Sequence, residues 1–174
     1  MKEFEQYTDS QLTQEIRQSN KEAFKVLYLR YYEKIYQFLW YKLYSDEKVR
    51  DFVQEVFTRI WQKREILDPK RSVKAYLYKT ANNIFIDSMR KRSSKIQYLS
   101  ELSISSQQTG EDIETRISIA TAVAHLPEKQ KTVFILSRYQ GLKYSEIAEV
   151  CKISIKTVES RMAKALEFLR NELK

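Results

Sequence analysis

The polar side chains with the clearest chemistry lie near the C-terminal end of the chain. Residues 154–164 combine hydroxyl, cationic and carboxylate groups with apolar residues at helical spacing. Side chains of these types read DNA, because lysine and arginine donate to guanine or phosphate, glutamate accepts from cytosine, and hydroxyls bond to either. The candidates for contact with a DNA duplex are Ser154, Lys156, Thr157, Glu159, Ser160, Arg161 and Lys164.

A helix-turn-helix would position these side chains. The pattern predicts a short helix over 145–151, a tight turn, and a long helix from Ile155 to about Leu173, with Ser154 as its N-cap. The second helix of such a motif places its N-terminal residues against base edges in the major groove. The competing interpretation is a three-helix protein-binding bundle whose polar face is merely solvated.

A further helix is expected before this pair. Pro127 fits its first helical position, where an N–H is not needed, and Glu128 favours the positive end of a helix. We expect the helix to end near Tyr139, because Gly141 can terminate it.

Charge divides the chain into two basic blocks and an acidic connector. The formal net charge is +8, of which residues 1–92 contribute +6, residues 93–116 contribute −2 and residues 117–174 contribute +4. A basic surface favours a polyanionic partner, either nucleic acid or an anionic membrane. The connector is rich in Ser and Gln without a helical stripe, which predicts a flexible linker between two small domains, 1–92 and 117–174. The alternative is a long surface loop within one domain.

Apolar stripes at three- and four-residue steps predict helices in the N-terminal block. One covers residues 24–39, a second begins at Asp46, and a third runs from near Val73 to Arg90 or beyond, after Pro69 interrupts the pattern. Only two glycines and two prolines are present, so the composition disfavours a turn-rich β fold. The expected fold class is therefore all-α, with two small helical domains.

The residues that catalysis or metal binding would need are scarce. Cys151 and His125 are the only residues of their types, so they form neither an intramolecular disulfide nor a zinc site. Asp51 and Glu55 stand four apart, but no other ligand completes a metal site, and no glycine-rich phosphate loop is present. We expect no enzyme activity and no cofactor.

The N-terminal residues and the lengths of the apolar runs bear on where the protein acts in the cell. The N-terminus has no signal-peptide pattern, and no apolar run approaches the ~18–20 residues of a membrane span. We therefore expect a cytoplasmic protein with no direct membrane insertion.

The C-terminal block resembles region 4 of the extracytoplasmic-function (ECF) sigma factors. The resemblance is carried by LPEKQ at 126–130, YSEIA at 144–148 and KTVE at 156–159, with Lys164-Ala165-Leu166 behind them. It implies that the final helix binds the −35 promoter element. Response regulators carry a similar Thr-Val-Glu helix, so the N-terminal block has to separate the two families.

The segment DFVQEVF at 51–57, with Ile60-Trp61, resembles region 2.2 of the same family. In that family the segment grips the clamp helices of the largest polymerase subunit. The resemblance assigns polar contacts with core polymerase to Asp51, Gln54 and Glu55, and exposed apolar anchors to Phe57 and Trp61. The alternative is that both aromatic side chains lie wholly in the core.

The segments AYLY at 75–78, ANN at 81–83, Ile86-Asp87 and RKR at 90–92 resemble regions 2.3 and 2.4, which bind and open the −10 element. The preceding loop, Lys70-Arg71-Ser72, holds an unstacked base in that family. Amide side chains would bond to base edges and cations to phosphates. The residues assigned to the −10 element are Lys70, Arg71, Ser72, Asn82, Asn83, Asp87, Arg90, Lys91 and Arg92. The alternative for residues 90–92 is a basic helix end favoured by the helix dipole.

The resemblance covers roughly residues 20–92 and 117–170. It implies a transcription initiation sigma factor that binds bacterial core RNA polymerase, directs it to promoter DNA, and is controlled by an anti-sigma factor. The alternative function is a stand-alone helix-turn-helix regulator that binds palindromic DNA as a dimer.

Four positions depart from the family pattern: Val49 and Arg50 before Asp51, Tyr76 where tryptophan is frequent, and Lys152. Arg50 stands where the family often has an acidic residue, which affects the expected clamp contact. Lys152 replaces the glycine common in the turn of the helix-turn-helix, so it must adopt a left-handed backbone or the turn must differ.

Overall fold

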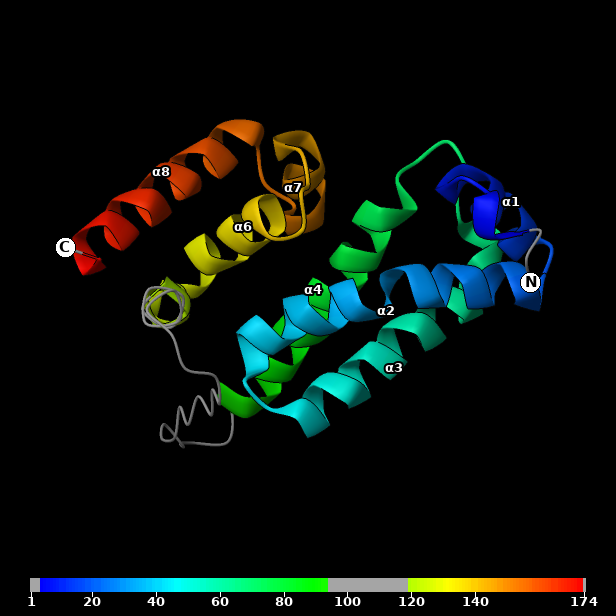
Figure 1. Ribbon diagram of the computed structural model, residues 1–174, viewed down its shortest axis with the longest axis horizontal. Coiled ribbons are helices and arrows are strands. Elements are labelled where there is room, and N and C mark those ends of the chain that lie inside the picture. Colours follow the sequence, from blue (N-terminus) through cyan, green and yellow to red (C-terminus); the bar gives the residue numbers. More distant parts are fainter. Residues whose placement is uncertain (1–3, 94–118, 174) are drawn as a thin grey trace, which may run out of the picture. The chain divides into compact units, whose positions relative to one another are not determined.

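The computed structural model describes residues 4–93 and 119–173, and its regular elements are helices (Figure 1). Within those ranges no strand occurs, which confirms the all-α prediction. The chain divides into two compact units, one built from α1 to α4 and the other from α6, α8 and the larger part of α7. Residues 94–116 of the predicted linker lie outside the described residues.

The N-terminal unit contains four α-helices whose apolar faces meet in one core. Helix α2 packs against α1, α3 and α4, and α3 also packs against α4. The three predicted helices are present, and α1 is an addition that the sequence reading missed. The elements are η1 (Phe4–Gln6), α1 (Asp9–Arg17), α2 (Lys21–Leu43), α3 (Asp46–Gln62), η2 (Arg64–Ile66) and α4 (Val73–Ser93).

Local capping explains where α1 and α2 begin. Thr8 and Gln11 form a capping box, in which Thr8 Oγ1 accepts from the Gln11 N–H at 3.3 Å and the Thr8 N–H donates to Gln11 Oε1 at 2.8 Å. Asn20 caps α2 by accepting from the N–H groups of Glu22 and Ala23. These side chains satisfy helix donors that would otherwise need water.

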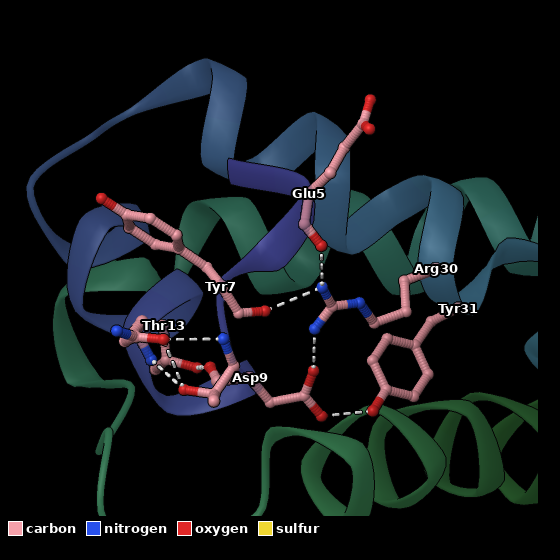
Figure 2. A network of polar contacts seen from close by, with 8 residues as sticks. Glu5, Tyr7, Asp9, Thr13, Arg30 and Tyr31 are labelled. Atoms are coloured by element: carbon pink, nitrogen blue, oxygen red, sulfur yellow. Dashed lines mark hydrogen bonds and ion pairs between the residues drawn. The ribbon is translucent and has the colours of Figure 1, made fainter. Parts of the chain in front are cut away.

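A polar network fastens the first residues of the unit to α2 (Figure 2). Arg30 donates to Asp9 Oδ1 at 2.7 Å, to the Tyr7 carbonyl at 2.8 Å and to the Glu5 carbonyl at 3.3 Å. The Tyr31 hydroxyl donates to the other carboxylate oxygen of Asp9. Burial, and next the hydrogen bond to Asp9, raise the pKa of Tyr31 well above its ordinary value, so the phenol remains a donor.

Asp9→Ala is expected to lower the free energy of unfolding of this unit by about 1 kcal/mol, because it leaves Arg30 and Tyr31 without their shared acceptor. The carboxylate side chain is 34% exposed, so solvent screening keeps the effect modest. Guanidinium unfolding followed by tryptophan fluorescence measures it, since both tryptophans, Trp40 and Trp61, lie in this unit. Asp46→Ala, which removes an exposed bond to Tyr36, is the matched control. A loss as large in the control would contradict the role of the network.

The C-terminal unit contains α6 (Glu128–Arg138), α7 (Tyr144–Cys151) and α8 (Ile155–Glu172), and residues 119–125 are also helical. Helix α6 packs against α8. The core side chains come from all three helices and include Ile135, Leu136, Ile147, Val158 and Met162. The helix at 119–125 was not predicted from the sequence.

The predicted helix ends are close to those observed, with one correction. Pro127 is the N-cap of α6 and not its first helical residue; the helix begins at Glu128. Ser154 caps α8 as predicted, and Gly141 follows α6 with a positive φ of 63°.

The turn between α7 and α8 uses a left-handed lysine. Lys152 has φ 55°, and the Ile153 N–H donates to the Ala148 carbonyl at 3.0 Å. This is the hydrogen bond of a Schellman motif, which closes helices most easily when the left-handed residue is glycine. The turn therefore closes α7 with a left-handed lysine, at a conformational cost.

Lys152→Gly is expected to stabilise the C-terminal unit by up to about 1 kcal/mol, because a left-handed backbone is strained for lysine and unstrained for glycine. Slower amide hydrogen exchange in α7 and α8 would report the gain for this unit alone. Lys129→Gly, at an exposed position in the first turn of α6 without a positive φ, is the control and should not stabilise. Equal exchange in Lys152→Gly and the parent would contradict the strain.

Among the described helices, none has the length and apolar character that crossing a membrane requires.

Candidate nucleic-acid and polymerase interfaces

The start of α8 presents most of the predicted duplex-reading side chains to solvent. Thr157 and Arg161 are half-buried on the flank of the helix. The remaining candidates are exposed, namely Ser154, Lys156, Glu159, Ser160 and Lys164. Buried Val158, Met162 and Ala165 hold the opposite side of α8 in the core. The helix therefore offers a mixed donor and acceptor surface beginning at its N-terminus.

Two of these residues also build the helix end. Ser154 Oγ accepts from the Thr157 N–H at 3.1 Å and lies 2.8 Å from Thr157 Oγ1. Their hydroxyls are thus engaged in capping, and the longer side chains Lys156, Glu159 and Arg161 are better placed for contacts beyond the helix.

The loop before α4 is a fixed turn that exposes its cations. The Asp68 side chain accepts from the Lys70 N–H at 2.9 Å, and Ser72 Oγ accepts from the Ala75 N–H at 3.1 Å, which caps α4. Ser10 of α1 donates to the Pro69 carbonyl at 2.7 Å and fastens the loop to α1. The predicted residues Lys70, Arg71 and Ser72 are all exposed.

One predicted −10 contact is corrected by burial. Asn82 is only 5% exposed, so its amide cannot reach a base without rearrangement of α4. Asn83 is half-buried, and Asp87, Arg90 and Lys91 are exposed. The side chain of Arg92 lies outside what the structure describes.

Two hollows in the N-terminal unit bring in polar residues that the sequence reading missed. The first, of about 730 Å³, lies between α1 and the loop, and its lining includes Gln14, Gln18 and Lys70. The second, of about 110 Å³, lies between α3 and α4. It is lined by Arg59, Lys63, Tyr76, Lys79, Thr80 and Asn83. The first hollow supplies amides beside the predicted base-holding loop, and the second supplies three cations beside Asn83.

The predicted polymerase contacts lie along α3. Asp51 and Gln54 are exposed, and Glu55 is half-buried and paired with Arg59 one turn on. The expectation that Phe57 exposes an apolar edge is wrong. Phe57 is 3% exposed because it packs beneath Tyr28, with ring centroids 4.7 Å apart. Trp61 is half-buried and remains available as an anchor.

An aromatic groove of about 480 Å³ runs between α2 and α3. Its rings contact one another at tilted angles, with the ring centroids of Phe24 and Trp61 5.0 Å apart and those of Tyr28 and Tyr32 5.2 Å apart. Burial, and then the charge of neighbouring Tyr32, raise the pKa of Tyr28. The lining residues are Phe24, Tyr28, Tyr32, Arg50, Gln54, Phe57, Thr58 and Trp61. An apolar floor with polar rims suits the side of a partner helix.

Arg50, one of the departures from the family pattern, lies on this groove. Arg50 belongs to α3, so its cation adds a positive charge to the groove on the same helix as acidic Asp51 and Glu55. Within the described residues no group of three or more metal-ligating side chains is assembled.

Comparison with known proteins identifies the family of the chain. The family model described as "Sigma-70 region 2" matches residues 27–95, and "Sigma-70, region 4" matches residues 116–169. The ECF RNA polymerase sigma factor SigL of Mycobacterium tuberculosis is 30% identical over 131 residues, covering 71% of this chain and 73% of SigL. The chain belongs to the ECF family of RNA polymerase sigma factors. Its function is transcription initiation.

Other relatives agree with this sigma factor over nearly its whole length. SigW of Bacillus subtilis, an ECF RNA polymerase sigma factor, is 26% identical over 175 residues, covering 92% of this chain and 94% of SigW. Two solved structures share the fold, each at 24% identity. RpoE of Bartonella quintana, solved with the anti-sigma factor NepR, has a TM-score of 0.76 and covers 86% of this sigma factor and 96% of RpoE. CnrH, solved with the cytosolic domain of CnrY, has a TM-score of 0.74 and covers 95% and 96%.

Proposed function

We propose that this sigma factor divides promoter recognition between its two units, with residues 1–92 serving polymerase and the −10 element, residues 93–116 as linker and residues 117–174 serving the −35 element. The observation that carries the proposal is the pairing, in one sigma-factor chain, of a solvent-exposed reading helix with a separate unit that bears an aromatic groove and exposed cations. A regulator that acts alone on DNA has no need of the second surface.

The −35 contact is assigned to α8. Lys156, Arg161 and Lys164 donate to base edges or phosphates, and Glu159 accepts from cytosine. Ser160 adds an exposed hydroxyl. Ser154 and Thr157 hold the helix end through their paired hydroxyls, and only the hydrogen-bonding capacity left over in that pair would reach the DNA.

The −10 contact is assigned to the loop at 70–72 and the exposed face of α4. Single-stranded bases offer edges that amides and hydroxyls can bind, and backbone phosphates attract cations. Asn83 and Asp87, with Gln14 and Gln18 of α1, would supply the polar contacts. The cations are Lys70, Arg71, Arg90, Lys91 and Arg92, together with Arg59, Lys63 and Lys79.

The contact with core RNA polymerase is assigned to the aromatic groove and its rim. Trp61 and the α2 rings would receive apolar side chains of a polymerase helix, while Asp51, Gln54 and Glu55 would pair with basic and amide groups beside it. Phe57 supports the floor of the groove from the core and is not itself an exposed anchor.

The sigma factor RpoE was solved with the anti-sigma factor NepR, and CnrH was solved with the cytosolic domain of CnrY. By analogy we include in the proposal an anti-sigma factor that covers these same surfaces. The protein works without catalysis or a cofactor of its own, in the cytoplasm where polymerase meets the chromosome.

The test is transcription by bacterial core RNA polymerase on a fragmented genomic template, with and without the full chain. Discrete start sites that require the protein are expected, and their upstream sequences define both promoter elements. The proposal fails if no new starts arise while the free protein binds palindromic DNA tightly, as a stand-alone dimeric regulator would.

A further inference from the structure

Ile155 is an apolar side chain at the tip of the reading helix. It is the first residue of α8 and is 48% exposed. The apolar residues that face the core, Val158 and Met162, are buried, so Ile155 contributes little to holding α8 in place. Ile155 is therefore available for a contact outside the chain, and its position in α8 decides what that contact is.

The direction of the side chain points to that partner. The Cα–Cβ bond of a helical residue tilts toward the helix N-terminus, so a first-turn side chain projects past the start of the helix. In a helix-turn-helix, the start of the second helix faces base edges in the major groove. A side chain at the position of Ile155 is thus directed toward the floor of the groove.

The neighbouring groups leave this place to an apolar contact. Ser154 and Thr157 use their hydroxyls on one another and on the helix end, with Ser154 Oγ 2.8 Å from Thr157 Oγ1. Lys156 is exposed and suits phosphate or guanine. Ile155 can make no hydrogen bond, so it distinguishes bases only through apolar groups.

The apolar group on base edges of the major groove is the C5 methyl of thymine. We infer that Ile155 packs against the methyl group of a thymine in the duplex that α8 reads, and is a specificity-determining residue of this sigma factor. The inference rests on the proposed −35 contact of α8 and adds an apolar component to that contact.

Exposure alone does not distinguish such a residue, because isolated apolar side chains are common on protein surfaces. Leu166 provides the comparison within the same helix. It is 38% exposed on the same flank of α8, three turns further along, about 16 Å from Ile155 by the helical rise. Truncating Leu166 should therefore leave open-complex formation unchanged, whereas truncating Ile155 should lower it.

The experiment removes the methyl group from the DNA and the side chain from the protein, separately and together. Templates carry a promoter that this sigma factor uses, with each −35 thymine of either strand replaced in turn by uracil. Open-complex formation with core polymerase is measured for the parent, Ile155→Ala and Leu166→Ala. Helix content and thermal unfolding of each variant show that α8 is intact.

For the parent, we expect one uracil position to lower open-complex formation about fourfold, the cost of one unburied methyl group. Ile155→Ala should show the same loss on the thymine template and no further loss with uracil, while Leu166→Ala should match the parent. The inference is overturned if no thymine matters to the parent, or if Ile155→Ala stays as sensitive to uracil as the parent. Failure of the parent to form promoter-specific complexes on any template would overturn the proposed function itself, and the inference with it.

Discussion

Phe57→Ala is expected to lower the free energy of unfolding of the N-terminal unit by about 3–5 kcal/mol, the usual cost of truncating a buried phenylalanine. The side chain is enclosed between α2 and α3, with the Tyr28 ring centroid at 4.7 Å and that of Phe24 at 6.3 Å. Its removal leaves a cavity beneath the aromatic groove that neighbouring rings cannot fill without leaving their own contacts.

The measurement is guanidinium unfolding followed by the fluorescence of Trp40 and Trp61, which reports on this unit within the full chain. Leu29→Ala is the matched control, since Leu29 lies on the exposed side of α2 and should change the free energy by less than about 0.5 kcal/mol. A loss below about 1 kcal/mol for Phe57→Ala would contradict its burial and restore it as an exposed anchor.

The stability of the Phe57→Ala variant also determines how a loss of its affinity for polymerase is interpreted. If Phe57 were a direct contact, its truncation would weaken binding while leaving stability unchanged. We expect the opposite for Phe57→Ala: the free energy of unfolding falls, and the affinity for polymerase falls only because the groove is deformed.

The sequence predicted the helices whose stripes face a core. In α2, α3 and α4 the apolar residues recur at the helical period. Pro69 interrupts this pattern in the connection that precedes α4. Ser154 and Gly141 marked helix ends because their local chemistry acts without distant partners.

Two helices were not predicted from the sequence, each for a different reason. Helix α1 has only nine residues and a short stripe of Leu12 and Ile16, although the Thr8–Gln11 capping box was a usable signal. The helix at 119–125 borders residues where no stripe stands out, and its buried residues, Ala122 and Val123, are small.

The sequence predicted the chemical types of the site residues but not which of their side chains are buried. Burial of Asn82 and Phe57 depends on which face of each helix meets its neighbours, and adjacent residues of one motif fall on opposite sides. The aromatic groove joins Phe24 and Tyr28 of α2 to Trp61 of α3, a juxtaposition that only the packed unit creates. The motif of α3 alone does not predict which α2 residues line the groove with it.

Arg161→Ala is expected to lower promoter-dependent open-complex formation on the order of 30-fold while leaving the affinity for core polymerase unchanged. The magnitude corresponds to losing roughly 2 kcal/mol of base recognition, within the range for one arginine on a guanine. Arg161 is half-buried on α8. An arginine in such a position can cover apolar surface with its stem while its guanidinium stays at the surface, where it can donate to a base edge.

Arg170→Ala is the matched control, because it removes the same charge from the exposed far end of α8, about 13 Å along the axis. Open complexes are measured on the promoter, and core affinity is measured separately without DNA. A residue that only binds phosphate would weaken all sequences alike, whereas a base-reading residue relaxes discrimination at one promoter position. Equal losses of promoter use and core affinity, or an equal loss in Arg170→Ala, would show that α8 does not read the promoter through Arg161.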